Sequence, residues 1–549
     1  MRAKDKGRHP GMSTVAKTKV TTVVQAMAEV LRRVGTPYVF GLPGGEVVDL
    51  MNALKEADIP FLLTKHENTA AFAAGVTGEI MGIPGVSVAT LGPGATNMAT
   101  GVANAWMDRD PVIAITGQIA APRYNVATHQ VLDSVAFYRP ITKWSAAVHP
   151  GSAAETLHRA IRIATSERPG PVHLALSSDL ANAEAGGKYP TTSPVRTYVG
   201  MGAPCKKSLS KAKGMIAAAG RPVIFAGLGV LRADAGDSLI GLAEKLGAPV
   251  IVTPKAKGVI PEDHPLFAGV FEMLGDKLVL ELGERADLIV ACGLDVVELD
   301  KPWNFQAPVI HVDALPNSDE FYPAEVELVG HPATALSALA EQLPTRRAWT
   351  LQELSSHRRD LLELITHAGT GMAAHQVVAA ARKVLPKETV ATCDVGAHKF
   401  LVGQMWTTYA PKSFFMSNGL SSMGYGFPAA MAAQLAWPDK PVVAFLGDGG
   451  FAMYMAELET ARRLELPLIV VVFCDGTLSL IAMSQERRGL PHYAVDFTNP
   501  DIVKVAEAFG ADGKVCETAS EVEAAITSAW TKRRLTVIQA IVDPGPYRV

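Results

Sequence analysis

The chain has 549 residues, of which 48% are hydrophobic and 19% charged, and its formal net charge is -3. This length exceeds that of one domain, and this composition is typical of a globular protein with large cores, which excludes a disordered chain. The near-neutral charge, without a basic stripe or polybasic tract, argues against a partner that is nucleic acid or a membrane surface. No run of about 18 apolar residues is present, so no membrane span is expected.

Residues 1–17 are basic and lack an apolar core, so we expect a disordered tail there and not a secretory signal. The five cysteines are scattered and form no CxxC pair. Such a set is typical of a reducing compartment, and we expect a cytoplasmic protein.

Short apolar runs alternate with Ala-rich helical stretches, such as 68–81 and 153–167, along the whole chain. The runs expected to form strands are 37–42, 85–91, 111–116, 171–176, 222–227, 249–253, 288–293, 309–313, 389–394, 441–448, 468–475 and 535–543. This alternation predicts an α/β fold with parallel sheets that are covered by helices on both faces.

Two polar stretches, 182–205 and 343–372, interrupt this alternation and are expected to be linkers. They divide the chain into three expected α/β domains of similar size, and the first and third are candidates for related folds. The expected domains are 18–185, 200–343 and 370–549.

The most informative motif is Gly447-Asp448-Gly449-Gly450, which ends an apolar run and precedes a helical stretch. Glycines at a strand end let backbone N–H groups approach a phosphate, and a helix N-terminus favours that anion. Asp448 is placed to hold Mg²⁺, which prefers carboxylate and phosphate oxygens. Asp475 and the carbonyl of Thr477 follow the next strand and complete the expected metal site. The alternative, a simple tight turn, is disfavoured by this second acidic strand end.

The stretch resembles the diphosphate-binding motif of thiamine-diphosphate enzymes, which begins with GDG and usually ends in Asn-Asn. Asp475 lies 27 residues (475 − 448) after Asp448, as in that family, but the pair here is Cys474-Asp475. Aspartate is still a hard oxygen ligand, and flavin-free acetolactate synthases of the catabolic type tolerate it at this place.

Further segments extend the resemblance over nearly the whole chain after residue 18. VFGLPGGEVVDLMNAL, TKHENTAAFAAGVTGEIMG and TLGPGATNMATGVANAWMDRDPVIAITGQ resemble the pyrimidine-binding domain of acetolactate synthases, whereas CDVGAHKF and SNGLSSMGYGFPAAMAAQLA resemble their diphosphate-binding domain. The resemblance implies the thiamine-diphosphate-binding fold, with pyrimidine-binding, central Rossmann-like and diphosphate-binding domains in this order.

The resemblance also gives roles to single residues. Glu67 would donate a proton to the aminopyrimidine ring of the cofactor; without the resemblance it is a favourable charge at a helix N-terminus. Met423 would separate the two cofactor rings, with the Ser421 carbonyl and the Met423 N–H on the pyrimidine; otherwise it is a core methionine. Gln118 would face the reaction centre. Further implied cofactor contacts are Gly44, Gly396, Ala397, His398, Gly447, Gly449, Gly450, Thr477, Leu478, Ser479 and Leu480.

The central part indicates the branch of the family. Flavin-dependent synthases carry an Arg in a GxRFDDR-like segment, whereas the segment here is ACGLDVVELDKPWNF. VIHVDALPNSDEFYPAEVELVGH and THQVLDSVAFYRPITKWS resemble the flavin-free synthases. We therefore expect thiamine diphosphate and Mg²⁺ but no FAD. His129, Gln130 and Lys143 become candidate active-site residues, and Lys143 is either a cation near the substrate carboxylate or a solvated surface lysine.

The implied reaction is decarboxylation of a 2-oxo acid, pyruvate in the first place, and ligation to a second carbonyl, which gives 2-acetolactate from two pyruvates. The family's cofactor site lies between two subunits, which implies at least a homodimer and favours a homotetramer. Alternatives are a 2-oxo acid decarboxylase, a phosphate-using acyl-transfer enzyme, a carboligase with another acceptor, and an inactive structural or regulatory homologue. A nicotinamide oxidoreductase is disfavoured because GLGVLRADAG lacks a GxGxxG motif.

The acceptor is left open by the residues after the metal motif. Arg487-Arg488-Gly489-Leu490 stands where catabolic synthases favour Lys-Tyr. Two arginines are able to bind a second carboxylate or an anionic acceptor, and the alternative is a solvated basic pair that ends a helix.

Overall fold

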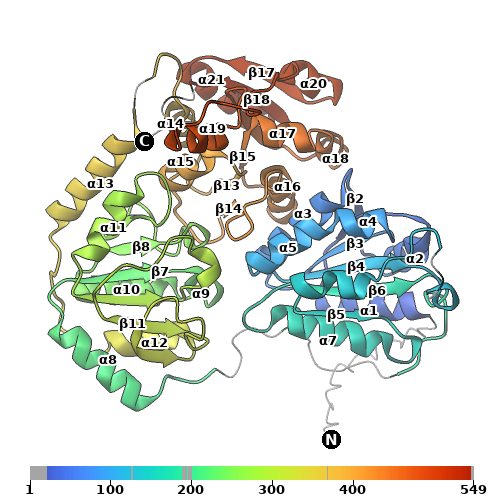
Figure 1. Ribbon diagram of the computed structural model, residues 1–549, viewed down its shortest axis with the longest axis horizontal. Helices are drawn as coiled ribbons and strands as arrows, with labels where there is room; N and C mark the ends of the chain where they lie inside the picture. The colour runs from blue at the N-terminus through green and yellow to red at the C-terminus, as the bar shows by residue number, and fades with distance from the viewer. Residues whose placement is uncertain are drawn as a thin grey trace, which may run out of the picture.

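The structure, a computed structural model, describes residues 22–124, 126, 128–187, 195, 201–367, 369–543 and 545. The tail expected at 1–17 and part of the linker expected at 182–205 lie outside these residues. The described chain forms three α/β units, drawn in blue to teal, green, and orange to red in Figure 1.

The N-terminal unit contains a six-stranded parallel sheet in the order β2-β1-β3-β4-β6-β5. Its strands are β1 (Val39–Leu42), β2 (Phe61–Leu63), β3 (Gly85–Ala89), β4 (Val112–Gln118), β5 (Trp144–Ala147) and β6 (Val172–Ser177). Its helices are α1 (Val23–Val34), α2 (Val48–Glu56), α3 (Glu67–Met81), α4 (Pro93–Asn97), α5 (Ala99–Met107), α6 (Ser134–Tyr138) and α7 (Ala153–Thr165), with the short helices η1 (Gly45–Val47), η2 (Ala121–Arg123), η3 (Arg139–Ile141) and η4 (Pro150–Ser152).

The central unit has the order β12-β11-β10-β7-β8-β9, again with parallel strands. The strands are β7 (Pro222–Ala226), β8 (Val250–Val252), β9 (Phe267–Val270), β10 (Leu288–Cys292), β11 (Val309–Asp313) and β12 (Ala324–Val329). The helices are α8 (Lys206–Ala218), α9 (Leu228–Arg232), α10 (Gly236–Leu246), α11 (Asp276–Glu284), α12 (Pro332–Ala340) and α13 (Leu351–Ile365), with η5 (Pro254–Ala256) and η6 (Val296–Glu298).

The C-terminal unit has the order β14-β13-β15-β16-β18-β17, which repeats the strand order of the N-terminal unit. The strands are β13 (Val390–Cys393), β14 (Phe414–Met416), β15 (Val442–Gly447), β16 (Ile469–Cys474), β17 (Asp512–Cys516) and β18 (Thr536–Ile541). The helices are α14 (Ala374–Val384), α15 (Ala397–Met405), α16 (Gly426–Ala436), α17 (Asp448–Tyr454), α18 (Glu457–Arg463), α19 (Ser479–Arg487), α20 (Ile502–Ala508) and α21 (Ala519–Lys532).

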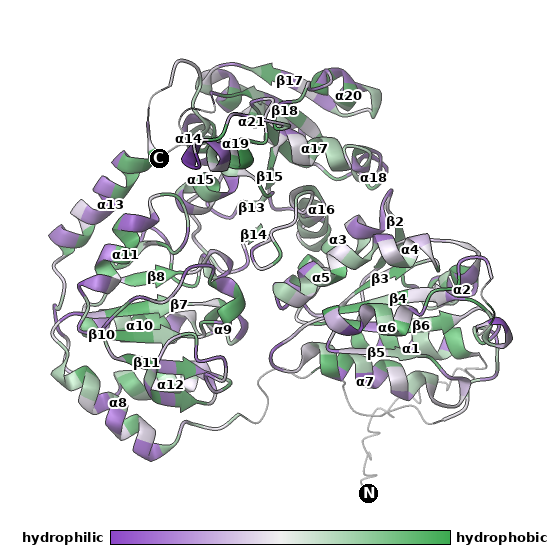
Figure 2. Cartoon of the chain, viewed as in Figure 1, coloured by the Kyte–Doolittle hydropathy of each residue, from purple (hydrophilic) through white to green (hydrophobic). Residues whose placement is uncertain are grey.

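The predicted fold class is confirmed, and burial explains the pattern that predicted it. Central strands such as β4, β10 and β16 are buried at every position, so helices must cover both faces of each sheet. In Figure 2 strands such as β4 and β10 are largely green, whereas outer helices such as α8 and α13 include purple segments. None of the helices in the described ranges is long and apolar enough to cross a membrane.

The segment 343–372 differs from the linker that the sequence predicts. It contains α13, whose Leu354, Leu361 and Ile365 are buried in the same core as the central sheet. Just before the helix, the indole of buried Trp349 donates a hydrogen bond to the Pro222 carbonyl at the start of β7 (2.9 Å). The charged residues that suggested a linker form only the outer face of this helix.

The N- and C-terminal units meet through two Ala-rich helices, α3 and α16, which lie side by side in Figure 1. Both are buried on nearly all sides, as expected for helices that are apolar all round. Small residues also allow α5 to pack closely on α3, since a Cβ at Gly101 of α5 would lie 2.5 Å from Ala71 of α3. The contact between α3 and α16 therefore keeps the N- and C-terminal units next to each other.

A buried ion cluster joins the central unit to the N-terminal one. The ammonium of Lys255, in η5, lies 2.8 Å from the Glu79 carboxylate of α3 and 3.4 Å from that of Asp110. Burial alone would lower the pKa of Lys255, but these two carboxylates raise it well above its usual range, so the lysine is charged.

We predict that Lys255→Met lowers the melting temperature strongly, because it leaves two carboxylates buried without a cation. Breaking a buried pair from one side costs about 3–5 kcal/mol. The control is Lys211→Met, which removes an exposed pair with Glu325 and should leave the melting temperature unchanged. Equal melting temperatures for the two variants would contradict the prediction.

Candidate functional site

Two acidic strand ends meet at the carboxyl edge of the C-terminal sheet. Strands β15 and β16 are parallel neighbours, so Asp448 and Asp475 follow adjacent strand ends. Asp448 is 3% exposed, and its carboxylate accepts hydrogen bonds from the N–H groups of Asp475 (3.2 Å) and Gly476 (2.9 Å). It also accepts one from the side-chain amide of Asn499 (2.6 Å). The spacing of the motif therefore corresponds to direct contact in the fold.

Asp475 lies half-buried at the same sheet edge. Its carboxylate accepts hydrogen bonds from the Ser479 hydroxyl (2.5 Å) and the Thr477 N–H (3.2 Å). Burial, followed by the charge of Asp448, raises the pKa of Asp475 to about 6. Two neighbouring carboxylates at one edge, one buried and one half-buried, favour a bound cation. Since no group of three His, Cys, Asp or Glu side chains able to hold a metal exists among the described residues, such an ion needs carbonyl or phosphate oxygens as well.

Two glycines of the motif, Gly449 and Gly450, lie close to neighbouring segments of the chain. A Cβ at Gly450 would lie 2.0 Å from the Asp394 carboxylate, and a Cβ at Gly449 would lie 3.3 Å from the methyl group of Met423. Asp394 follows β13 and is fully buried; its carboxylate accepts the N–H groups of Gly424 (2.8 Å) and Tyr425 (3.1 Å). It thereby fixes the loop that carries Ser421 and Met423 over the Gly449 backbone.

His398 lies at the same edge and has a ring nitrogen without a hydrogen-bond partner among the described residues. It lies in the first turn of α15, is 4% exposed and stacks on Phe473 at 5.4 Å between ring centroids. Burial lowers the pKa of His398 to about 4, so the ring is neutral. Its Nε2 is buried and has no hydrogen-bond partner among the described residues, while Cβ atoms at Gly396 and Gly447 would lie 2.9 and 3.1 Å from the ring. An unpartnered buried nitrogen beside Gly-rich strand ends fits a bound polar group.

A second group of predicted residues gathers at the carboxyl edge of the N-terminal sheet. Glu67, the first residue of α3, is 5% exposed and accepts a hydrogen bond from the Asn97 amide (3.0 Å). Gln118, at the end of β4, donates to the Leu132 carbonyl (2.9 Å). Gly44 follows β1, and its Cβ would lie 2.3 Å from the Thr90 hydroxyl.

The remaining predicted residues of this unit differ in exposure. His129 and Gln130 are exposed, and the Gln130 side chain lies against Gly92, where a Cβ would come within 3.0 Å. The ammonium of Lys143 is half-buried and donates to the carbonyls of Ser166 and Arg168, both at 2.6 Å. These contacts use the donors of Lys143 to hold a loop, which supports a structural role for it.

The segments around the two edges are in contact within one chain, because the N–H groups of Lys65 and His66, next to Glu67, donate hydrogen bonds to the Glu457 carboxylate (2.9 and 3.0 Å). No hydrogen bond or ion pair in the described ranges connects Glu67, Gln118 or Gly44 with the segment 447–480. The partners of each group come from its own unit. The contact between α3 and α16 holds the two sheets together elsewhere.

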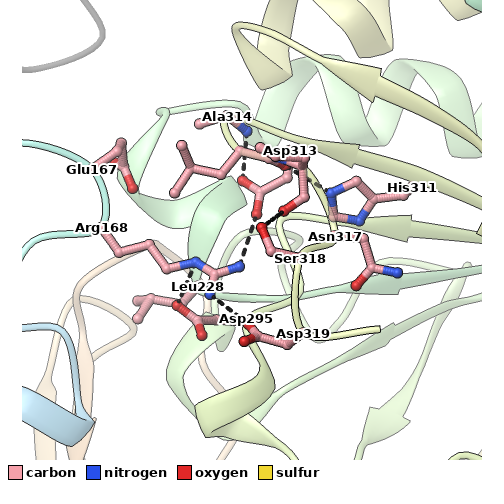
Figure 3. Close-up of polar contacts among 12 residues, drawn as sticks. Glu167, Arg168, Leu228, Asp295, His311, Asp313, Ala314, Asn317, Ser318 and Asp319 are labelled. Atoms are coloured by element: carbon pink, nitrogen blue, oxygen red, sulfur yellow. Dashed lines mark hydrogen bonds and ion pairs between the residues drawn. The ribbon is translucent and has the colours of Figure 1, made fainter. Parts of the chain in front are cut away.

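The central sheet reverses its strand order between β7 and β10. Open α/β sheets bind nucleotides in the crevice at such a reversal. Figure 3 shows Arg168, from the loop after α7, reaching into this crevice. Its guanidinium lies 3.2 Å from Asp295 and 3.2 Å from Asp319, and 4.0 Å from Asp313. A cavity of about 100 Å³ remains beside Leu228.

Arg109 binds the same Asp295 carboxylate at 3.1 Å. Burial raises the pKa of Asp295, but the two arginines outweigh it and hold that pKa below its usual range. The crevice is therefore occupied by charges of the chain itself, and they are paired.

Comparisons with known proteins agree with this geometry. Three stretches match the thiamine pyrophosphate enzyme descriptions: the N-terminal TPP binding domain over residues 21–137, the central domain over 209–339 and the C-terminal TPP binding domain over 394–540. The chain belongs to the thiamine pyrophosphate enzyme family. The expected recognition, the enzyme class and the thiamine diphosphate cofactor are thus confirmed.

Several curated relatives match almost end to end. The chain is 32% identical to a probable acetolactate synthase large subunit of Methanocaldococcus jannaschii, over 95% of this chain and 92% of the relative. It is 31% identical to an acetolactate synthase of Bacillus subtilis, over 93% and 91%. It is also 30% identical to a probable 2-ketoarginine decarboxylase of Pseudomonas aeruginosa, over 95% and 94%.

Three residues of this thiamine pyrophosphate enzyme were not anticipated from the sequence. Asn499 and Asp394 support the metal motif and the Met423 loop, but neither belongs to the segment that carries the motif. Lys399 follows His398 directly and is 4% exposed. Asp394 and Lys399 both belong to the CDVGAHKF segment that resembles the diphosphate-binding domain, and Asp394 also ends an expected strand, whereas Asn499 lies in no such segment.

We predict that Gly450→Ala raises the dissociation constant of thiamine diphosphate at least about tenfold, a cost of about 1.4 kcal/mol. The added Cβ would displace Asp394 and with it the Met423 loop. Binding is measured by calorimetric titration with Mg²⁺ present. The control is Gly241→Ala, a helix position where a Cβ meets open space; equal affinities of the two variants would contradict the proposed use of this glycine.

Proposed function

We propose that the protein decarboxylates a 2-oxo acid, in the first place pyruvate, and joins the remaining acyl unit to a second carbonyl compound. With pyruvate as acceptor, two pyruvate anions and one proton give one 2-acetolactate anion and CO₂. The observation that carries the proposal is the pair of Asp448, which is buried, and Asp475, which is half-buried, at one sheet edge beside the loop that carries Ser421 and Met423. The acetolactate synthases among the relatives support the same reaction.

Bound thiamine diphosphate would supply the electron sink for decarboxylation and the carbanion for ligation. Asp448, Asp475 and the carbonyl of Thr477 would hold Mg²⁺, an ion that prefers carboxylate and phosphate oxygens. The backbone of Gly447, Gly449 and Gly450 would approach the diphosphate. The other residues proposed to contact the cofactor are Gly44, Gly396, Ala397, His398, Ser421, Met423, Leu478, Ser479 and Leu480.

Glu67 is proposed to exchange a proton with the aminopyrimidine ring, and Gln118, His129 and Gln130 to lie near the reacting carbon. The family resemblance implies that each cofactor site lies between the N-terminal unit of one subunit and the C-terminal unit of another. We therefore propose a homodimer as the smallest active unit, with a homotetramer as the favoured assembly. The described cysteines are all free, which supports the proposed cytoplasmic location.

The proposed function is tested with purified protein, thiamine diphosphate, Mg²⁺ and pyruvate, with CO₂ and products identified by mass. The expected result is 2-acetolactate in excess over acetaldehyde. Acetaldehyde alone would favour the second candidate, a simple 2-oxo acid decarboxylase, which the similarity to the probable 2-ketoarginine decarboxylase supports. No CO₂ from any of a panel of 2-oxo acids would overturn both.

We predict that Glu67→Gln cuts turnover at least about 100-fold, since it removes a general acid–base group. The fold should be unchanged, because glutamine can keep the contact with Asn97. The measurement is the steady-state rate of CO₂ release together with the melting temperature. The exposed Glu56→Gln, in the same unit, serves as the control. Near-normal turnover of Glu67→Gln would exclude Glu67 from the chemistry.

We predict that the protein binds no flavin, because Arg168 and its acidic partners occupy the central crevice. Purified protein should show no flavin absorption in the visible range, and titration with FAD should leave flavin fluorescence unquenched. Stoichiometric FAD in the purified protein would contradict this.

A further inference from the structure

A cavity that borders the loop carrying Ser421 and Met423 lies between the central and C-terminal units. It has a volume of about 900 Å³, and its wall includes Ala397, Lys399, Ser421 and Leu480 next to Glu272 and Val297 of the central unit. Ala397, Ser421 and Leu480 are among the residues proposed to contact the cofactor. The cavity therefore opens beside the proposed reaction centre, and it is much larger than one pyruvate.

Lys399 is the buried cation of this wall. It is 4% exposed, and its ammonium donates one hydrogen bond, to the hydroxyl of Ser421 (2.9 Å). That hydroxyl in turn donates to the Asn418 carbonyl (2.8 Å), so the lysine is held toward the loop. No ion pair in the described part of the chain includes Lys399. Burial lowers the pKa of Lys399, as expected for an ammonium without a direct carboxylate partner.

The acidic side chains of the wall do not supply this partner. Three of them already accept hydrogen bonds from other groups of the chain; these are Glu272, Asp276 and Glu298. Asp300 is exposed, as are the cations Lys277 and Arg487. A buried ammonium that keeps donors for the cavity is suited to bind an anion there, because buried charges are otherwise paired.

Resting on the proposed function, we propose that Lys399 binds the carboxylate of the acceptor 2-oxo acid and so selects acidic over neutral acceptors. In the ligation, the acyl carbon forms a bond to the acceptor's carbonyl carbon, the carbonyl oxygen takes up a proton, and the acceptor's carboxylate is retained. The donor's carboxylate instead leaves as neutral CO₂. A cation on that leaving group would stabilise the reactant more than the transition state, so Lys399 suits the retained carboxylate.

The test uses Lys399→Met in the full-length holoenzyme, with pyruvate as the donor. The 2-acetolactate formed per CO₂ should fall at least about tenfold, and acetaldehyde should rise correspondingly. Ligation to a neutral acceptor, added benzaldehyde, should continue at the wild-type level relative to CO₂. Lys399→Arg, which keeps a cation, should restore part of the 2-acetolactate. Lys277→Met, an exposed cation on the same cavity, is the matched control and should keep the wild-type ratio.

Two further outcomes decide against the inference. An unchanged ratio of 2-acetolactate to acetaldehyde in Lys399→Met would overturn it. A parallel loss of thiamine diphosphate affinity, measured by calorimetric titration, would assign Lys399 to the cofactor and not to the acceptor. If wild-type protein releases no CO₂ from pyruvate or any other 2-oxo acid of the panel, the proposed function itself fails and the role of Lys399 with it. If wild-type protein makes 2-acetolactate and the variant keeps its ratio, only the role of Lys399 fails.

Discussion

The close approach of two carboxylates, buried Asp448 and half-buried Asp475, is the constraint on which the C-terminal unit depends. Parallel strands place both residues at one sheet edge, where burial and the charge of Asp448 raise the pKa of Asp475. The chain compensates with donors from Gly476, Asn499 and Ser479. The same donors fix the positions of the two strand ends. They therefore hold the two carboxylates side by side, as a bound cation would require.

The N- and C-terminal units use one scaffold for two different tasks. Their sheets share the same strand order, and each presents its polar residues at the carboxyl edge. The N-terminal edge offers a single buried acid and amides, whereas the C-terminal edge offers paired carboxylates and glycines. Neither edge alone has the groups that both ends of a thiamine diphosphate molecule require, which explains why the family needs two such units.

The sequence was informative where a function depends on neighbours in the chain. The strand ends, the Gly447–Gly450 turn and the helix of Glu67 are local patterns, and the structure has all three elements. Asp394 and Asn499 act across 30 and 51 residues, where spacing carries no signal. The sequence predicts a linker at helix α13 because few of its residues are apolar and buried, and the sheet against which they pack lies far away in the sequence. The partners of Arg168 and the surroundings of Lys399 depend on how the units dock, and no local pattern reports that.

The ion pairs of Arg168 limit which units of this protein can be exchanged separately. The arginine belongs to the N-terminal unit, and the carboxylates it neutralises belong to the central unit. A central unit transplanted alone into a related protein would carry a buried Asp295 without Arg109 and Arg168, its two ion-pair partners. Exchange of modules between relatives, in the laboratory or by recombination, therefore has to carry the segment after α5 and the loop after α7 together with the central unit.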